Sequence, residues 1–213
     1  SSDVCSSDLT TRIHRALGLA AAMAVALPGL VPSTASAQGT LRIAMTAADI
    51  PRTLGQPDQG FEGNRFTGIP MYDGLTQWDL SSADKASVVV PSLATDWAVD
   101  ANDKTKWTFK LRPGVKFHDG SAFNADAVVW NVDKVLKQDA AHFDASQVGV
   151  TASRMPTLRS ARKIDDLTVE LTTAQPDSFL PINLTNLFMA SPAHWQKLYD
   201  ADRKSTRLNS SHM

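Results

Sequence analysis

The sequence has only one cysteine, Cys5, among its 213 residues. A single thiol cannot build a disulfide framework or a cysteine-based zinc site, so a small crosslinked scaffold and a zinc-finger module are both excluded. The sequence also lacks an excess of positive charge, because 21 Lys and Arg residues stand against 22 Asp and Glu residues. Nucleic acid is therefore not an expected partner, since a protein that binds the phosphate backbone needs a basic surface.

No apolar run in the sequence is long enough to span a membrane, which takes roughly 20 residues for a hydrocarbon core of about 30 Å. The run Leu17–Val31 follows Arg12 and Arg15 and precedes Ala35-Ser36-Ala37. A basic start, a short apolar run and a small-x-small site are typical of a cleavable export signal. We therefore expect residues 10–37 to be a signal peptide, with cleavage after Ala37 and a mature protein in the periplasm. An uncleaved N-terminal anchor is the alternative.

The two ends of the sequence are polar and differ from what lies between them. Residues 1–9 (SSDVCSSDL) and residues 202–213 (DRKSTRLNSSHM) both resemble translated sequencing-adapter DNA. Natural polar tails are the alternative, because terminal disorder is ordinary. We expect four segments: adapter-derived ends at 1–9 and 202–213, the signal peptide at 10–37, and part of a folded domain at 38–201.

Alternation of apolar and polar residues predicts the strands. The clearest case is Lys106–Leu111 (KWTFKL), which places Trp107, Phe109 and Leu111 on one face. A buried core face is the favoured interpretation, since an aromatic platform for bases would need a basic groove. The remaining predicted strands are Thr40–Thr46, Thr76–Leu80, Leu93–Val99, and a hairpin of Ser160–Ile164 with Thr168–Thr173.

Helical spacing of Val128, Val132 and Val135 predicts a helix over Ala125–Lys137, with Asn124 as its N-cap. Three weaker helices are expected within Arg65–Leu75, within Phe179–Met189 and from Pro192 onward, whereas Gln138–Thr157 is expected to be irregular.

The pair His118-Asp119 invites a catalytic or metal-binding interpretation. A general acid–base pair would need a third group and a cleft, and a metal site would need further ligands close by. A turn is the favoured interpretation, because Asp119-Gly120 is turn chemistry. The sequence also contains no nucleophile elbow, phosphate-binding loop or zinc-protease motif.

The loop Asp58–Gly68 (DQGFEGNRFTG) is the best candidate for ligand contact. Its three glycines permit close backbone approach, and Phe61, Glu62, Asn64 and Arg65 supply stacking, charge and hydrogen-bonding groups. The alternative is a solvated loop with an internal pair between Glu62 and Arg65.

Several segments occur in an order that resembles the N-terminal part of the family 5 extracellular solute-binding proteins. This family includes the periplasmic oligopeptide-, dipeptide- and nickel-binding components of ABC importers. The resemblance covers Thr40–Ala201, about the first third of a family member. The segments are YDGLT at 72–76, PSLATDW at 91–97, WTFKLRPGVKFHDG at 107–120, FNADAVVW at 123–130, DDLTVEL at 165–171, and Pro192.

The resemblance implies an α/β fold: the N-terminal part of lobe I of a two-lobe periplasmic-binding-protein fold of class II, with a mixed sheet and flanking helices, truncated. It also implies a monomeric, non-enzymatic protein that captures a peptide-like or other small polar solute between two lobes. The partners would be that solute and the permease subunits of an ABC transporter. No cofactor and no metal are expected.

The resemblance also implies where ligand is touched. It places the loop of Phe61, Glu62, Asn64 and Arg65 beside the cleft, and it adds Phe143 and Asn186. Packing or surface exposure is the alternative for those last two residues. The sequence of the loop departs from the commonest family pattern, so the ligand could differ from a generic peptide.

Two functions from other classes stay open at this point. One is a periplasmic hydrolase that uses Asp or His, which would need a convergent pair of titratable groups with perturbed pKa values in a pocket. The other is a peptide-binding chaperone or the partner of a chemoreceptor, which would show broad peptide affinity.

Overall fold

The computed structural model describes residues 40, 42–44, 63, 66 and 68–200. The chain divides into two compact units, Ser1–Ile43 and Ala44–Met213, and every described helix and strand belongs to the second unit. Within the described residues, no helix is both long and apolar enough to cross a membrane.

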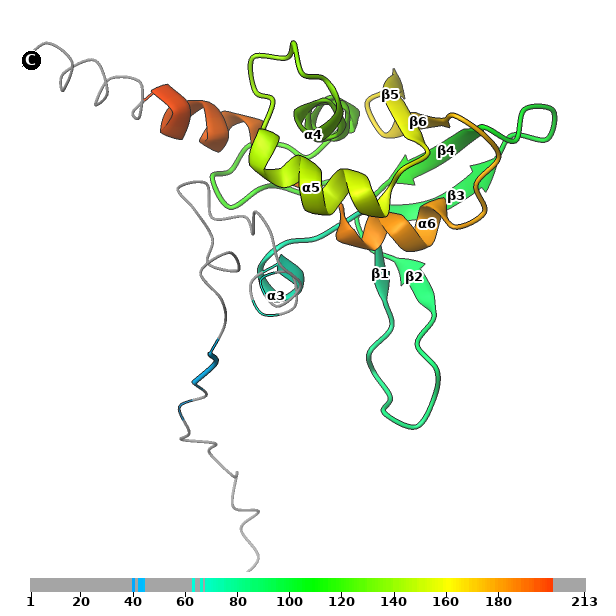
Figure 1. The fold of residues 1–213 in the computed structure, drawn as a ribbon, viewed down its shortest axis with the longest axis horizontal. Helices are drawn as coiled ribbons and strands as arrows, with labels where there is room; N and C mark the ends of the chain where they lie inside the picture. Colours follow the sequence, from blue (N-terminus) through cyan, green and yellow to red (C-terminus); the bar gives the residue numbers. More distant parts are fainter. Residues whose placement is uncertain (1–39, 41, 45–62, 64–65, 67, 201–213) are drawn as a thin grey trace, which may run out of the picture. The chain divides into compact units, whose positions relative to one another are not determined.

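The second unit combines short helices with two antiparallel sheets (Figure 1). Residues 192–200 are also helical. The named elements are α3 (Ile69–Met71), β1 (Thr76–Trp78), β2 (Val89–Pro91), β3 (Ala94–Val99), β4 (Lys106–Leu111), α4 (Ala125–Leu136), α5 (Ala145–Arg154), β5 (Leu158–Asp165), β6 (Thr168–Thr173), α6 (Leu180–Asn183) and the 3₁₀ helix η3 (Leu184–Asn186).

The larger sheet has the strand order β3-β4-β6-β5, and β1 pairs with β2 in a separate two-stranded ribbon. Phe109 on β4 lies opposite Trp97 on β3 and opposite Val169 on β6. The predicted hairpin around Asp165-Asp166 is therefore confirmed as β5–β6. The expected α/β class is also confirmed, and every strand pairing in the described part of the chain is antiparallel.

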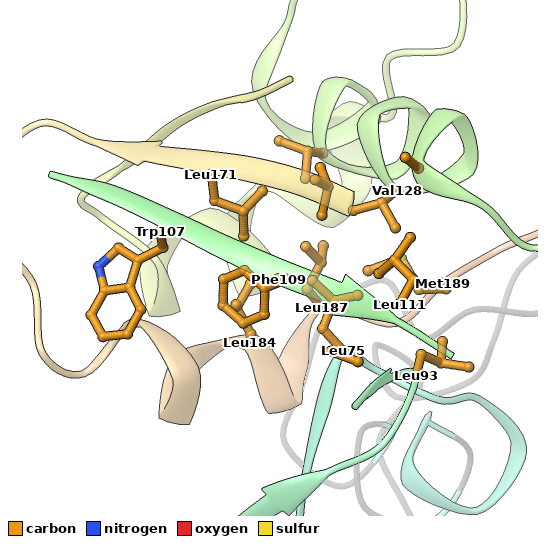
Figure 2. Close-up of a cluster of buried hydrophobic side chains, with 14 of the residues drawn as sticks. Leu75, Leu93, Trp107, Phe109, Leu111, Val128, Leu171, Leu184, Leu187 and Met189 are labelled. Atoms are coloured by element: carbon orange, nitrogen blue, oxygen red, sulfur yellow. The ribbon is translucent and has the colours of Figure 1, made fainter. Parts of the chain in front are cut away.

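The core lies on the face of β4 that the alternation predicted. Phe109 is fully buried, Leu111 and Trp107 are nearly so, and the intervening residues of β4 are exposed or half-buried. Trp97 stacks on Phe109 with ring centroids 6.2 Å apart. Figure 2 shows the buried cluster, to which β6 contributes Leu171 and η3 contributes Leu184.

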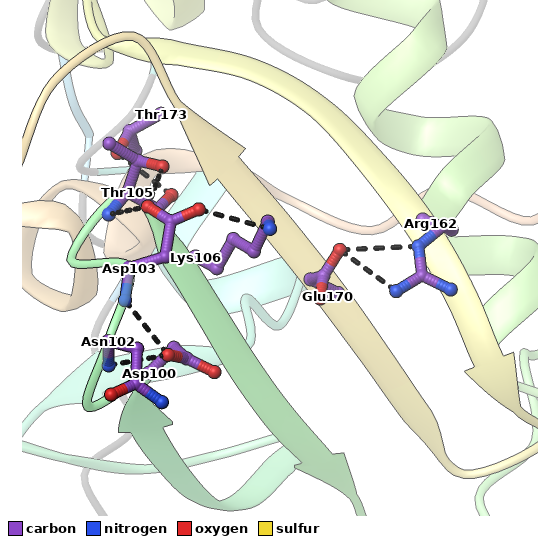
Figure 3. A network of polar contacts seen from close by, with 8 residues as sticks. All are labelled: Asp100, Asn102, Asp103, Thr105, Lys106, Arg162, Glu170 and Thr173. Atoms are coloured by element: carbon purple, nitrogen blue, oxygen red, sulfur yellow. Dashed lines mark hydrogen bonds and ion pairs between the residues drawn. The ribbon is translucent and has the colours of Figure 1, made fainter.

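The opposite face of the sheet is polar (Figure 3). Arg162 on β5 donates to Glu170 on β6, with Nη2 and Oε1 3.1 Å apart. In the β3–β4 turn, the Oδ1 atom of Asp100 accepts from the backbone N–H groups of Asn102 and Asp103 at 2.7 and 2.9 Å. Exposed ion pairs of this kind are screened by water and add little stability, so the buried face holds the sheet together.

The helix α4 begins at Ala125, directly after Asn124, the N-cap that the sequence predicted. The Oδ1 atom of Asn124 accepts a hydrogen bond from the N–H of Ala127 at 3.0 Å, which satisfies one of the free donors at a helix start. Asp126 in the first turn complements the helix dipole and pairs with Lys163 on β5 at 2.7 Å. The valine stripe of α4 is buried, and the helix contacts β5 and β6.

The structure differs from three of the predicted secondary-structure elements in extent or in kind. The stretch Gln138–Thr157 is not irregular throughout, because α5 occupies Ala145–Arg154 and packs against α4. Residues 40 and 42–44 form no strand, and the rest of Thr40–Thr46 lies outside the described residues. The helix expected within Phe179–Met189 ends at Asn186, where the chain extends so that the N–H of Met189 reaches the carbonyl of Asp73 at 2.9 Å.

Candidate ligand-binding pocket

Three separate segments, residues 71–73, 115–123 and 189–194, enclose most of a pocket of about 440 Å³. This volume falls in the range of small-molecule sites. Its apolar lining comes from Met71, Tyr72, Leu93, Val115, Phe117, Phe123 and Met189, and its polar lining from Asp73, Lys116, His118, Asp119, Ser191 and His194.

The segment 115–123 forms a tight loop that supplies one wall. Lys116 and Ala122 form an isolated bridge, and the N–H of Phe117 donates to the carbonyl of Ser121 at 2.9 Å. Gly120 closes the turn with φ at +84°, a conformation that side-chain-bearing residues rarely adopt. The predicted turn at His118-Asp119 is therefore confirmed, and it brings both side chains to the pocket lining.

The carboxylate of Asp119 is held by neighbouring serines. Its Oδ1 atom accepts from the N–H of Ser121 at 2.9 Å and from the Ser121 hydroxyl at 2.6 Å. Its Oδ2 atom accepts from the Ser191 hydroxyl at 2.6 Å. These hydrogen bonds, first those from the Ser121 and Ser191 side chains, hold the pKa of Asp119 well below its usual range. The Asp119 carboxylate is thus ionised, and its hydrogen bonds to Ser121 and Ser191 hold the loop in place.

The third wall, residues 189–194, is fixed from two sides. The buried side chain of Asn131 on α4 accepts from the N–H of Ala190 and donates to its carbonyl, each at 2.9 Å. On the other side, a Cβ added at Gly74 would lie 2.9 Å from the carbonyl oxygen of Leu184. This close backbone approach requires glycine, and it seats the chain before Met189 against the start of β1.

The remaining polar groups give the pocket charges of both signs. Asp73 and Lys116 are exposed, so their carboxylate and ammonium are free to meet water or ligand. Tyr72 is half-buried, and burial raises the pKa of its phenol, which therefore stays neutral and able to donate a hydrogen bond. Aromatic surface beside opposite charges suits a small molecule that carries both an ammonium and a carboxylate.

Among the residues that the structure describes, no group of three His, Cys, Asp or Glu is placed to hold a metal.

The predicted ligand contacts lie elsewhere or outside the described residues. Phe61, Glu62, Asn64 and Arg65 are not among the residues that the structure describes. Phe143 is half-buried after α4, and its N–H donates to the carbonyl of Ala140 at 3.0 Å. The assignment of these residues to ligand stays a prediction.

Asn186 is engaged within the protein. Its Oδ1 atom accepts from Arg154, and its Nδ2 atom donates to the carbonyl of Asn183 at 3.3 Å. Neither Asn186 nor Phe143 lines the pocket, so the structure does not bring them together with it. Asp73, Lys116 and His194 contribute polar groups to the pocket lining, but they were not among the predicted ligand contacts. The recurrence of the 72–76 and 107–120 segments in the family was the one signal that pointed near them.

Comparison with known proteins places this architecture in a sequence family. Residues 88–211 match the family model described as bacterial extracellular solute-binding proteins, family 5 Middle. The glutathione-binding protein GsiB of Pectobacterium atrosepticum is 35% identical over 143 residues, which cover 62% of this chain and 26% of that relative. The dipeptide-binding protein of Escherichia coli K12 is 30% identical over 142 residues, which cover 58% of this chain and 25% of that relative.

Solved structures show the same fold. The periplasmic binding protein DppA of Helicobacter pylori, in complex with the peptide STSA, superposes with a TM-score of 0.53 and 22% identity, over 68% of this chain and 30% of that chain. MoaA of A. tumefacien R10, in complex with mannopinic acid, superposes with a TM-score of 0.52 and 24% identity, over 67% of this chain and 28% of that chain. The present chain thus spans about a quarter of the length of the curated relatives it matches.

Proposed function

The chain belongs to the bacterial extracellular solute-binding proteins of family 5, and on that premise we propose that it is the N-terminal part of the substrate-binding component of an ABC importer. In this proposal the complete protein captures a peptide-like solute between two lobes and presents it to the permease. It performs no chemistry on the solute and acts as a monomer. The observation that carries the proposal is the family match over residues 88–211.

The peptide-like class of the solute is supported by the relatives and by the pocket. The relatives are named for binding glutathione, dipeptides, and di- or tripeptides. Short peptides carry an ammonium, a carboxylate and amide groups. Asp73 and Lys116 would meet the two charges, while Tyr72 and Phe117 would cover the apolar part.

Capture would follow the physics of enclosure. A ligand favours the closed form only if it binds that form more tightly, and burying most of the solute between two walls supplies that difference. The described pocket would form one wall. The predicted contacts Phe61, Glu62, Asn64 and Arg65 precede Tyr72 in the chain, and with Phe143 and Asn186 they would extend the contact area.

A hydrolase is supported less well by the same geometry. A serine nucleophile needs a base that accepts its proton. The Ser191 hydroxyl donates to Asp119 and accepts from the backbone N–H of His194 at 3.1 Å. Hydrogen bonds from Ser121 and Ser191 hold the pKa of Asp119 well below its usual range, so this carboxylate is a weak base. This hydroxyl is therefore committed to holding the loop and starting a helix.

Calorimetry on the complete protein that contains this chain tests the proposal. We expect it to bind dipeptides or glutathione, and we expect Asp73→Asn and Lys116→Met each to weaken binding about tenfold, because a hydrogen bond to a charged group is worth roughly 1.5 kcal/mol. Lys137→Met, an exposed lysine of the same charge that does not line the pocket, is the matched control and should bind normally. Binding of none of these peptides would contradict the proposed solute class, and hydrolysis of a bound peptide would contradict the non-enzymatic role.

Export is the second part of the proposal. Residues 10–37 would direct the protein to the periplasm, and this signal peptide would be removed by cleavage after Ala37. N-terminal sequencing of the protein recovered from the periplasm should begin at Gln38. A recovered protein that keeps Leu17–Val31 would instead indicate an N-terminal anchor.

A further inference from the structure

A second cavity, of about 180 Å³, adjoins the pocket. Tyr72 and Asp73 line both, so the two cavities are neighbours that share these two residues. The rest of the lining of the second cavity comes mainly from α3, from the residues between Gly74 and Leu80, and from Thr185 in η3 with Phe188 after it. The second cavity therefore extends the pocket toward the β1–β2 ribbon.

One wall of the second cavity is a face of β1 and its continuation. Thr76, Trp78 and Leu80 are alternate residues, which share a face in an extended chain, and all three line the cavity. The buried hydroxyl of Thr76 donates to the carbonyl of Pro181 at 2.7 Å. At the other end, the N–H of Asp79 donates to the carbonyl of Val88 at 2.8 Å. The wall is therefore held in place at both ends.

An aromatic side chain, Phe188, forms a second fixed part of the lining. Phe188 is 9% exposed, and its ring packs against the backbone at Gly68, where an added Cβ would overlap the ring. The Tyr72 ring lies beside it, with the two ring centroids 6.2 Å apart. The aromatic surface thus continues from the second cavity into the pocket through Tyr72.

The chemistry of the second cavity is apolar. Asp73 is the one charged residue among its described lining residues. Three of the others, Ile69, Trp78 and Leu80, are large apolar side chains with exposed fractions of 49%, 37% and 67%. Large apolar side chains gathered around a cavity favour an apolar ligand group, which removes them from water. An apolar cavity of about 150 Å³ holds a benzene molecule, so this one has room for a phenyl ring.

The position of Asp73 determines which part of a peptide reaches the second cavity. In a peptide, the side chain of the first residue is attached to the same carbon atom as the terminal ammonium. An ammonium at Asp73 therefore brings that side chain to the second cavity, because Asp73 lines both cavities. The rest of the peptide then extends through the pocket toward Lys116.

We infer that the second cavity is the subsite for the first side chain of a peptide-like solute, and that it selects a large apolar side chain at that position. The inference rests on the proposed function. The competing occupant is a segment of the complete protein outside this chain, which spans about a quarter of the length of its relatives. The continuity of the two cavities through Tyr72 and Asp73 favours the solute.

Calorimetry on the complete protein that contains this chain compares phenylalanyl-glycine, glycyl-phenylalanine and glycyl-glycine. Phenylalanyl-glycine should bind about tenfold more tightly than the other two, since it alone buries a phenyl ring in the second cavity. Equal affinities for the three would overturn the inference and leave the proposed function intact. Binding of none of the three would also overturn it, and a titration with glutathione then shows whether the proposed function falls with it.

A variant of the cavity wall separates this subsite from other contacts to the same peptides. In Leu80→Ser the advantage of phenylalanyl-glycine over glycyl-glycine should shrink about threefold, because one apolar wall is lost. Leu167→Ser is the matched control, since Leu167 is an exposed leucine that lines neither cavity, and it should retain the full advantage. An equal advantage in the two variants would overturn the inference. Leu80 is 67% exposed, so its replacement leaves the core intact.

Nuclear magnetic resonance of the complete protein shows directly whether the phenyl ring reaches the second cavity. The indole N–H resonance of Trp78, identified by its loss in Trp78→Phe, should shift on saturation with phenylalanyl-glycine, because a ring beside the indole changes its local magnetic field. Glycyl-glycine should shift this resonance much less. A Trp78 resonance that stays in place in the phenylalanyl-glycine complex would overturn the inference and would indicate that another segment of the complete protein fills the cavity.

Discussion

The carboxylate of Asp119 accepts a hydrogen bond of 2.6 Å from the hydroxyl of Ser191, and the two residues are 72 positions apart in the sequence. The same hydroxyl accepts from the N–H of His194 at 3.1 Å. One serine side chain therefore ties the turn at 118–120 to the start of the helix at 192–200. Two walls of the pocket depend on this contact.

Replacing Ser191 by alanine should lower the free energy of unfolding by about 1 kcal/mol, the typical cost of losing a side-chain cap at a helix start. Urea denaturation measures the change. Ser178→Ala, at an exposed loop position, is the control and should stay within about 0.5 kcal/mol of the unaltered chain. Equal stability of the two variants would show that the cap adds nothing.

Acid should weaken the contact between Asp119 and Ser191. Hydrogen bonds from Ser121 and Ser191 depress the pKa of Asp119 below its ordinary value of 3.8. A group with a depressed folded pKa contributes stability that is full above the unfolded pKa and is lost as the pH falls through the folded one. Melting temperatures measured below pH 4 should therefore fall less steeply for Asp119→Asn than for the unaltered chain, whereas parallel acid profiles would contradict this role.

The central face of β4 should dominate the stability of the sheet. Phe109 is fully buried, so Phe109→Ala should cost about 3–5 kcal/mol. Thr108, the next residue on β4, lies on the opposite face and is only half-buried. Thr108→Ala should cost less than about 1 kcal/mol. Near-zero destabilisation by Phe109→Ala in chemical denaturation would be inconsistent with this core.

Two glycines should respond in opposite ways to the same substitution. At Gly74 the added Cβ would lie 2.9 Å from the carbonyl oxygen of Leu184 and 3.1 Å from that of Thr76. Because both obstacles are backbone, Gly74→Ala should cost about 1–3 kcal/mol. At Gly149 in α5 nothing lies within 4 Å of the added atom. Gly149→Ala should therefore stabilise by about 0.5–1 kcal/mol through helix propensity, and calorimetric melting compares the two.

The elements that sequence reasoning found are those whose pattern is local. Apolar and polar residues alternate strictly along β4, and Asn124 precedes a helix with a regular valine stripe. Each element can therefore be predicted from a short stretch of sequence. The helix α5 was missed because Ala145–Arg154 has a central glycine and valines that favour strands. Its helical form is supported by packing against α4, which no local window contains.

The pocket could be foreseen only in part for a related reason. The turn at Asp119-Gly120 can be predicted from two adjacent residues. Ser191, which donates a hydrogen bond to the Asp119 carboxylate, is distant in sequence. The same holds for Asn131 and Ala190, which are 59 positions apart. Nothing in the local pattern around Lys116 or His194 indicates that the two side chains line one pocket. The family resemblance supplied the function class without supplying this geometry.

We propose that the described pocket forms one wall of a peptide-binding site, and an NMR titration of the isotope-labelled 213-residue chain with a short dipeptide tests this role. One wall leaves most of the ligand in water, so binding should be weak, with a Kd of about 1 mM or above. We expect saturable shift changes at Asp73, Lys116 and His194, and none on the polar sheet face around Glu170. Shift changes confined to that sheet face, no changes at all, or submicromolar binding by this chain alone would contradict it.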